Sequence, residues 1–236
     1  MARKASRPGG SDTPPAHPGT GTPRDRIIEA FMTLLAEQPI ERIGLAAIAE
    51  RAEVRLAELR AEFGSPLAVL AAHVKAIDRA VLAGVDPEMQ DEPPREQLFD
   101  VLMHRLELLA PHKEAIRSLL RSSRRDPPLA LALNAMAVRS QQWMLAAAGI
   151  GTSGPKGMVR AQGLTLLFAQ VLRTWVHDDE ENTRTLAALD NQLARGQRFA
   201  GLLDDLCVIP RAACAMRRRL RRRPRRRPRY DDYYAA

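Results

Sequence analysis

Apolar residues recur every three or four positions along most of the chain, which is the spacing of one face of an α-helix. Leu and Ala supply most of these positions, and no strand-length run of alternating β-branched residues is present. Proline and glycine interrupt the pattern and mark helix ends. The pattern predicts an all-α protein of about nine helices, at about 24–37, 45–52, 56–63, 66–83, 95–109, 112–123, 127–148, 155–177 and 180–207.

Composition divides the chain into four parts. Residues 1–23 are rich in Gly, Pro, Ser and Thr, and residues 210–236 begin at a proline and become rich in arginine. We expect both segments to be disordered, because neither can bury enough apolar surface to fold. Between them, 24–83 is predicted to form a small helical domain that ends in a linking helix, and 84–209 a larger helical domain.

The positive charge of the chain is concentrated near its C-terminus. The formal net charge is +8, but residues 211–229 alone contain eleven arginines and no acid. The body between the two terminal segments is therefore mildly acidic. The high isoelectric point belongs to the tail and does not by itself indicate a nucleic-acid-binding domain.

Several other classes of protein are disfavoured. Cys207 and Cys214 lack the spacing and the neighbours of a zinc site, so we expect free thiols in a reducing compartment. No apolar run is long enough to cross a membrane, and the N-terminus lacks a signal core, which favours a soluble cytoplasmic protein. The segment 177–180 is better interpreted as a helix cap than as a metal site. We expect no catalytic site, metal or cofactor.

Two short helices in the first domain are joined by a tight turn at Glu53, Val54 and Arg55. Longer helices flank this pair on both sides. That arrangement is the helix-turn-helix, which presents its second helix to the major groove of DNA.

The residues of this region resemble the N-terminal domain of the TetR family of transcriptional regulators. Its pattern is roughly I-A-x-x-A-G-V-S-x-x-x-L-Y-x-x-F-x-S-K-x-x-L, and the segment 27–70 carries it. The positions that agree with the pattern are Ile48, Ala49, Ala52, Val54, Leu59, Phe63, Ser65 and Leu70. The resemblance implies a homodimer that binds double-stranded operator DNA and a small ligand, most simply as a repressor.

The chain departs from this pattern where the family usually contacts DNA. Glu53 replaces the glycine of the turn, and Arg60 replaces a tyrosine. Segment 50–63 has three arginines and four glutamates, so it lacks the positive charge that phosphate binding favours. A helix-turn-helix kept only as scaffold therefore remains an alternative. The candidate DNA-binding residues are Arg51, Arg55, Leu56 and Arg60.

The resemblance also implies a ligand cavity among the central helices and a dimer interface formed by the last two. The ligand is expected to be apolar or lipid-like, and its candidate contacts are Met103, Leu106, Leu120, Met136, Gln141, Trp143 and Phe168. The candidate interface residues are Leu172, Trp175, Leu189, Leu193 and Phe199. Each apolar side chain in these two sets can also be an ordinary core residue.

Residues 174–193 are similar to a segment of the coenzyme Q biosynthesis accessory proteins. Trp175, Asp178, Asp179, Leu189 and Asp190 agree with that segment in kind. Those proteins share the TetR fold, do not bind DNA and hold an isoprenoid lipid. The second resemblance therefore implies a lipid-binding protein without a DNA role. Acids at a helix start are also favoured by the helix dipole alone.

The arginine-rich tail has three interpretations. It can raise non-specific affinity for DNA, contact an anionic membrane surface, or remain a solvated extension. If it binds DNA, deletion of 211–236 should reduce the salt dependence of binding, because fewer counterions are released. An unchanged dependence would exclude that interpretation.

Overall fold

The computed structural model describes residues 21–85, 91–179 and 181–197, and all of their regular structure is helical. The α-helices are α1 (Pro23–Glu37), α2 (Leu45–Arg51), α3 (Leu56–Glu62), α4 (Pro66–Ala83), α5 (Pro94–Leu109), α6 (Lys113–Ser123), α7 (Pro127–Ala147) and α8 (Gly154–Trp175). Two 3₁₀ turns, η1 (Ile40–Arg42) and η3 (Ala110–His112), precede α2 and α6. Residues 183–197 are helical as well. None of the described helices is long and apolar enough to cross a membrane.

The helix starts follow local capping chemistry. The Thr22 hydroxyl accepts the Asp25 amide at the start of α1, and the Asp25 carboxylate accepts the Thr22 amide in return. The side chains of Ser65 at α4 and Asp126 at α7 each accept one amide from the first turn, and each residue is followed by a proline that needs no amide partner there. These caps explain why the predicted helix starts agree closely with the observed ones.

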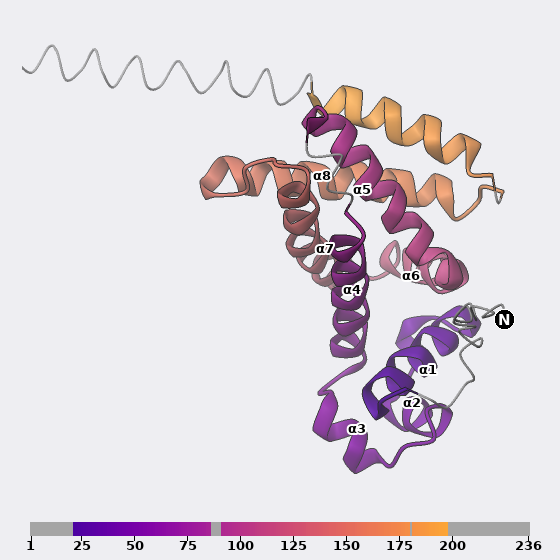
Figure 1. The fold of residues 1–236 in the computed structure, drawn as a ribbon. Helices are drawn as coiled ribbons and strands as arrows, with labels where there is room; N and C mark the ends of the chain where they lie inside the picture. The colour runs from indigo at the N-terminus through magenta and orange to yellow at the C-terminus, as the bar shows by residue number, and fades with distance from the viewer. Residues whose placement is uncertain (1–20, 86–90, 180, 198–236) are drawn as a thin grey trace, which may run out of the picture.

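The described helices fall into two units joined by α4 (Figure 1). The first unit contains α1, α2 and α3, and its apolar cluster is centred on Ile27, Phe31 and Ile48. The second unit contains α5, α7, α8 and the helix 183–197, with a separate cluster between them. The change from one cluster to the other falls inside α4, between Leu70 and Ile77. Helix α6 packs across α1 and so connects the units a second time.

The predicted all-α class is confirmed, and the predicted helix ends agree with the structure to within a few residues. The last predicted helix, 180–207, begins at 183, and its part beyond 197 lies outside the described residues. The predicted disordered segments also lie outside them, apart from 21–23, where Pro23 already begins α1. The domain limits at 83/84 and 209/210 stay predictions.

Candidate functional site

The turn of the helix-turn-helix has an unusual backbone. Glu53 adopts a left-handed conformation with φ of 53°, in the position where the TetR pattern has glycine. A residue with a Cβ atom pays a steric cost there. The amide of Val54 donates to the carbonyl of Ala49 at 3.0 Å and closes the turn. The turn is therefore formed in spite of the substitution of its glycine.

Helices α2 and α3 are too short to be stable alone, and packing on α1 holds them. Leu59 and Phe63 are buried in the first apolar cluster. The opposite side of α3 faces solvent, because 56% of the Leu56 surface is exposed and Arg60 is exposed too. Helix α3 lies at the free end of the first unit, remote from α5, α7 and α8 (Figure 1).

Acidic side chains pair with two of the three predicted DNA-binding arginines. Arg51 donates two hydrogen bonds to Glu37 at the end of α1, at 2.8 and 2.9 Å, and these lower the pKa of Glu37. Arg55 donates to Glu58 at 2.9 Å, and the Arg55 backbone amide donates to the same carboxylate. Among the described residues, Arg60 has no ion-pair partner. The structure thus places Leu56 and Arg60 on α3 with Arg55 at its N-cap, and ties Arg51 back to α1.

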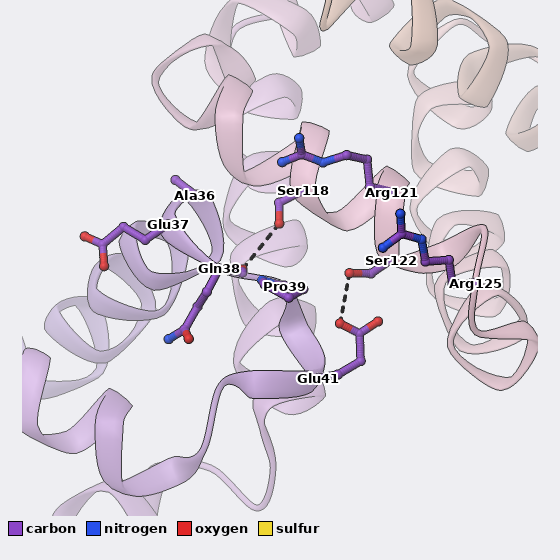
Figure 2. Close-up of a pocket in the computed structure, with 9 residues that line it drawn as sticks. All are labelled: Ala36, Glu37, Gln38, Pro39, Glu41, Ser118, Arg121, Ser122 and Arg125. Carbon is purple, nitrogen blue, oxygen red and sulfur yellow. Dashed lines mark hydrogen bonds between the residues drawn. The ribbon is translucent and has the colours of Figure 1, made fainter.

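A cavity of about 400 Å³ lies where α6 meets the end of α1 and η1 (Figure 2). Two buried serines of α6 join the units here: Ser118 donates to the carbonyl of Gln38 at 3.3 Å, and Ser122 to the Glu41 carboxylate at 3.1 Å. The lining residues are Ala36, Glu37, Gln38, Pro39, Glu41, Ser118, Arg121, Ser122 and Arg125. The sequence analysis did not predict this contact, although two serines four residues apart on one helix face indicate a polar contact there.

A second cavity, of about 270 Å³, lies between α6 and the end of α8. Its lining is rich in arginine, and sequence reasoning did not find it. The residues are Arg117, Leu120, Arg121, Arg124, Arg173, Val176 and His177. The spacing on α6 predicts a basic helix face, but only the fold brings Arg173 to it.

Polar side chains are also buried inside the second unit. Arg105 of α5 donates to Asp78 of α4 at 2.6 Å, and Ser140 of α7 donates to the same carboxylate oxygen at 2.6 Å. The Arg105 guanidinium lies 5.7 Å from the centroid of the Phe168 ring on α8. Among the described residues, Nε of Arg105 and Oε1 of buried Gln141 have no hydrogen-bond partner. Arg105 therefore brings together polar or aromatic side chains from α4, α5, α7 and α8.

Solved structures with this arrangement of helices are known. A TetR transcriptional regulator from Nitrosomonas europaea is 23% identical, with a TM-score of 0.59 over 75% of this chain and 99% of that chain. A putative TetR-family regulator from Syntrophomonas wolfei is 12% identical, with a TM-score of 0.54 over 75% and 94%. A regulator of the same family from Streptomyces coelicolor is 13% identical, with a TM-score of 0.52 over 87% and 91%.

The chain has the TetR-type fold. These identities are low, so the likeness concerns the arrangement of the helices. No family model and no curated protein matches the sequence.

Within the TetR-type fold, the predicted ligand contacts do not form one group. Leu106 and Phe168 are buried in the second cluster, and Met103 and Leu120 pack against that cluster. Gln141 is buried as well, and Leu120 also lines the arginine-rich cavity. The remaining two lie elsewhere: Met136 packs against the first cluster, and Trp143 is 58% exposed.

The predicted interface residues are mostly interior in the TetR-type fold. Trp175 is 2% exposed, and Leu189 and Leu193 are buried with it in the chain's own core. Leu172 packs against that core and is partly buried. Phe199 lies outside the described residues. The exposed apolar side chains of α8 are instead Met158, Val159 and Leu166, and Leu186 is exposed on the helix 183–197.

The acidic segment after α8 has a structural role. Asp178 accepts hydrogen bonds from the amide and the hydroxyl of Thr185, both at 2.7 Å, and one from Arg184 at 3.0 Å. Desolvation raises the pKa of Asp178, but these hydrogen bonds outweigh it and lower the pKa to about 2. Asp178 therefore holds the first turn of the helix 183–197, which explains this acid without a lipid.

Proposed function

We propose that the chain is a homodimeric transcriptional regulator of the TetR type that binds operator DNA through α3. The observation that carries this proposal is the placement of α3. Packing of Leu59 holds the helix at the free end of the first unit, while Arg55, Leu56 and Arg60 face outward. Side chains on the outer face of a recognition helix reach base edges and phosphates in the major groove.

The charges around α3 indicate which contacts contribute most. Arg60 is not engaged by an acid of the described residues, so phosphate or guanine can bind it without breaking an ion pair. The Arg55 side chain is highly exposed, and its pair with Glu58 is readily exchanged. Glu50 and Glu53 repel phosphate. We therefore expect binding to depend strongly on Arg60 and on salt concentration.

The exposed apolar residues of α8 support a dimer. Val159 and Leu166 lie two turns apart on one exposed face, with Gly163 between them. A second copy would cover this face and place the two recognition helices about 34–36 Å apart, the distance between half-sites on one side of DNA. Leu166→Glu should convert a dimer into a monomer in light scattering. The matched change Leu131→Glu, at an exposed position of α7, should leave the dimer intact.

We infer that a small apolar or amphipathic ligand controls DNA binding from the second unit. The buried atoms of Arg105 and Gln141 without partners support a site there, because a ligand that satisfies them recovers the cost of leaving them unpaired. The simplest consequence is a repressor that releases DNA when the ligand binds. If so, Gln141→Leu should retain DNA binding but require more of a releasing ligand. An unchanged ligand requirement would exclude Gln141 from the site.

Selection from a pool of random duplexes tests the DNA-binding proposal. The full-length protein should enrich a two-fold symmetric sequence, and the variant Leu56→Ala, Arg60→Ala should lose that enrichment. Arg139→Ala, an exposed arginine of α7, is the control. The arginine-rich tail remains in every protein, so its non-specific affinity is constant. Failure of the wild-type protein to enrich any sequence would contradict the proposal.

A second candidate is a lipid-binding protein of the same fold without a DNA role. The pairing of Arg51 with Glu37 and of Arg55 with Glu58 supports it, because arginines already paired with acids gain less from binding phosphate. Mass spectrometry of an organic extract of the purified protein distinguishes the two. A stoichiometric isoprenoid lipid, together with no enriched duplex, would support the lipid-binding function.

A further inference from the structure

The cavity between α6 and α8 is surrounded by positive charge. Arg117 and Arg121 of α6 and its C-cap Arg124 follow helical spacing, and Arg173 approaches them from the last turn of α8. None of the seven residues that line the cavity is acidic. Like charges gathered around one hollow repel each other, and a bound anion would relieve that repulsion.

Only one of these arginines has a structural role in the described residues. The Arg117 side chain donates to the carbonyl of Val176 and forms an ion pair with Glu114 at 2.5 Å. Lys113 donates to the carbonyl of Asp178 at 2.8 Å. Together, these two cations bind the carbonyl groups at the end of α8, where the helix dipole favours positive charge.

The other three arginines have no such partner. Arg121, Arg124 and Arg173 make no side-chain hydrogen bond or ion pair within the described part of the chain, and all three are exposed. The acid nearest in sequence to Arg173, Asp178, is buried and is held by Thr185 and Arg184. The charge of these arginines is therefore available to a ligand.

Two apolar side chains contribute to the lining of the cavity. Val176 is buried and Leu120 is half-buried, and both belong to the lining. The volume of about 270 Å³ lies just below the range of about 300–1,000 Å³ that is typical of small-molecule sites. It accommodates a compact head group and a short chain.

We propose that this cavity binds an anionic amphiphile, with a phosphate or carboxylate head group among Arg121, Arg124 and Arg173 and its apolar part on Leu120 and Val176. Guanidinium groups bind both kinds of oxyanion through paired hydrogen bonds. This site is separate from the buried polar atoms around Asp78 and from α3. It does not depend on whether the protein binds DNA.

Trp175 supplies a local reporter for the test, because it immediately precedes Val176 and is one of only two tryptophans in the chain. Trp143→Phe in the full-length protein leaves Trp175 as the sole source of tryptophan emission. Octyl phosphate and octanoate, below their micelle concentrations, should each change this emission saturably. Octanol should not, and the stronger of the two anions identifies the preferred head group.

Arg124→Ala with Arg173→Ala should weaken the binding of the preferred anion at least tenfold. The matched control, Arg79→Ala with Arg139→Ala, removes two exposed arginines elsewhere and should leave it unchanged. Circular dichroism verifies that both double variants are folded. The proposal is overturned if neither anion gives a saturable change, if octanol binds equally well, or if both double variants bind alike. Because no DNA is present, a failure here leaves the DNA-binding proposal untouched.

Discussion

The two units of the molecule have cores of different kinds. Between residues 21 and 72, every buried side chain of the described structure is apolar, whereas the buried polar side chains all lie from His73 onward. The core of the first unit thus supports α3 through apolar packing. The second unit has hydrogen-bonded polar side chains among its buried residues. The two units should therefore respond differently to substitution.

The substitution with the largest expected effect on stability breaks the buried ion pair of the second unit. Arg105→Ala leaves Asp78 charged and buried, and we expect a loss of about 3–5 kcal/mol in the free energy of unfolding. Phe31→Ala in the first unit should cost about as much, but through a cavity. Urea unfolding measures both.

The double change Asp78→Leu, Arg105→Met tests whether the loss of stability in Arg105→Ala comes from the unpaired buried charge of Asp78. It removes both charges and keeps apolar volume, so most of the lost stability should return, apart from the cost of leaving the Ser140 hydroxyl without its acceptor. If the double variant is as unstable as Arg105→Ala, the ion pair itself stabilises the second unit and the comparison is wrong on this point.

The pH dependence of stability should also come from the second part of the chain. Desolvation of His73, with smaller contributions from the charges of His112 and Arg105, lowers its pKa to about 4, against 6.5 for the free side chain. The unfolded chain therefore binds the proton first as the pH falls. The free energy of unfolding should be constant above pH 6.5 and fall by up to about 3 kcal/mol as the pH approaches 4.

Urea midpoints measured between pH 8 and pH 4.5 check this expectation. His73→Phe, which retains an aromatic ring, should flatten the profile. Asp178 does not interfere, because its lowered pKa affects stability only below its ordinary pKa of 3.8. If the profile is equally steep in His73→Phe, another group causes the pH dependence of stability.

The unfavourable feature of the first unit is the backbone conformation of its turn. Glu53 is in the left-handed region, so Glu53→Gly should raise the free energy of unfolding by about 1 kcal/mol. The change also removes a negative charge beside α3 and should strengthen DNA binding. Glu50→Gln removes a neighbouring charge without a backbone effect, and it separates the two contributions. No gain in stability would show that the turn is unstrained.

The helices could be predicted from the sequence because proline, glycine and capping residues mark their ends, as Thr22 and Pro23 do for α1. The faces of the helices were harder to assign. Helix α7 has apolar residues on all sides, so its pattern did not show that Trp143 faces solvent. For Trp175, the pattern predicts burial, but one chain's sequence does not distinguish burial within the chain from burial in a dimer.

The candidate site was predictable to the extent that it lies on one short segment. Leu56 and Arg60 share the outer side of α3 because they are four residues apart, and Arg55 directly precedes the helix as its N-cap. The partners of the arginines were not predictable, since Glu37 is distant in sequence from Arg51. The arginine-rich cavity requires the ends of α6 and α8 to meet, and only tertiary packing provides that.

The central claim is that α3 recognises a base sequence, and a ratio of two affinities tests it most directly. Fluorescence anisotropy at physiological salt gives the affinity of the full-length protein for a selected duplex and for a scrambled one. We expect a large ratio in the wild-type protein and in Arg139→Ala. We expect a ratio near one in the double variant Leu56→Ala, Arg60→Ala. A wild-type ratio near one, or a ratio that the changes in α3 do not alter, would contradict the account.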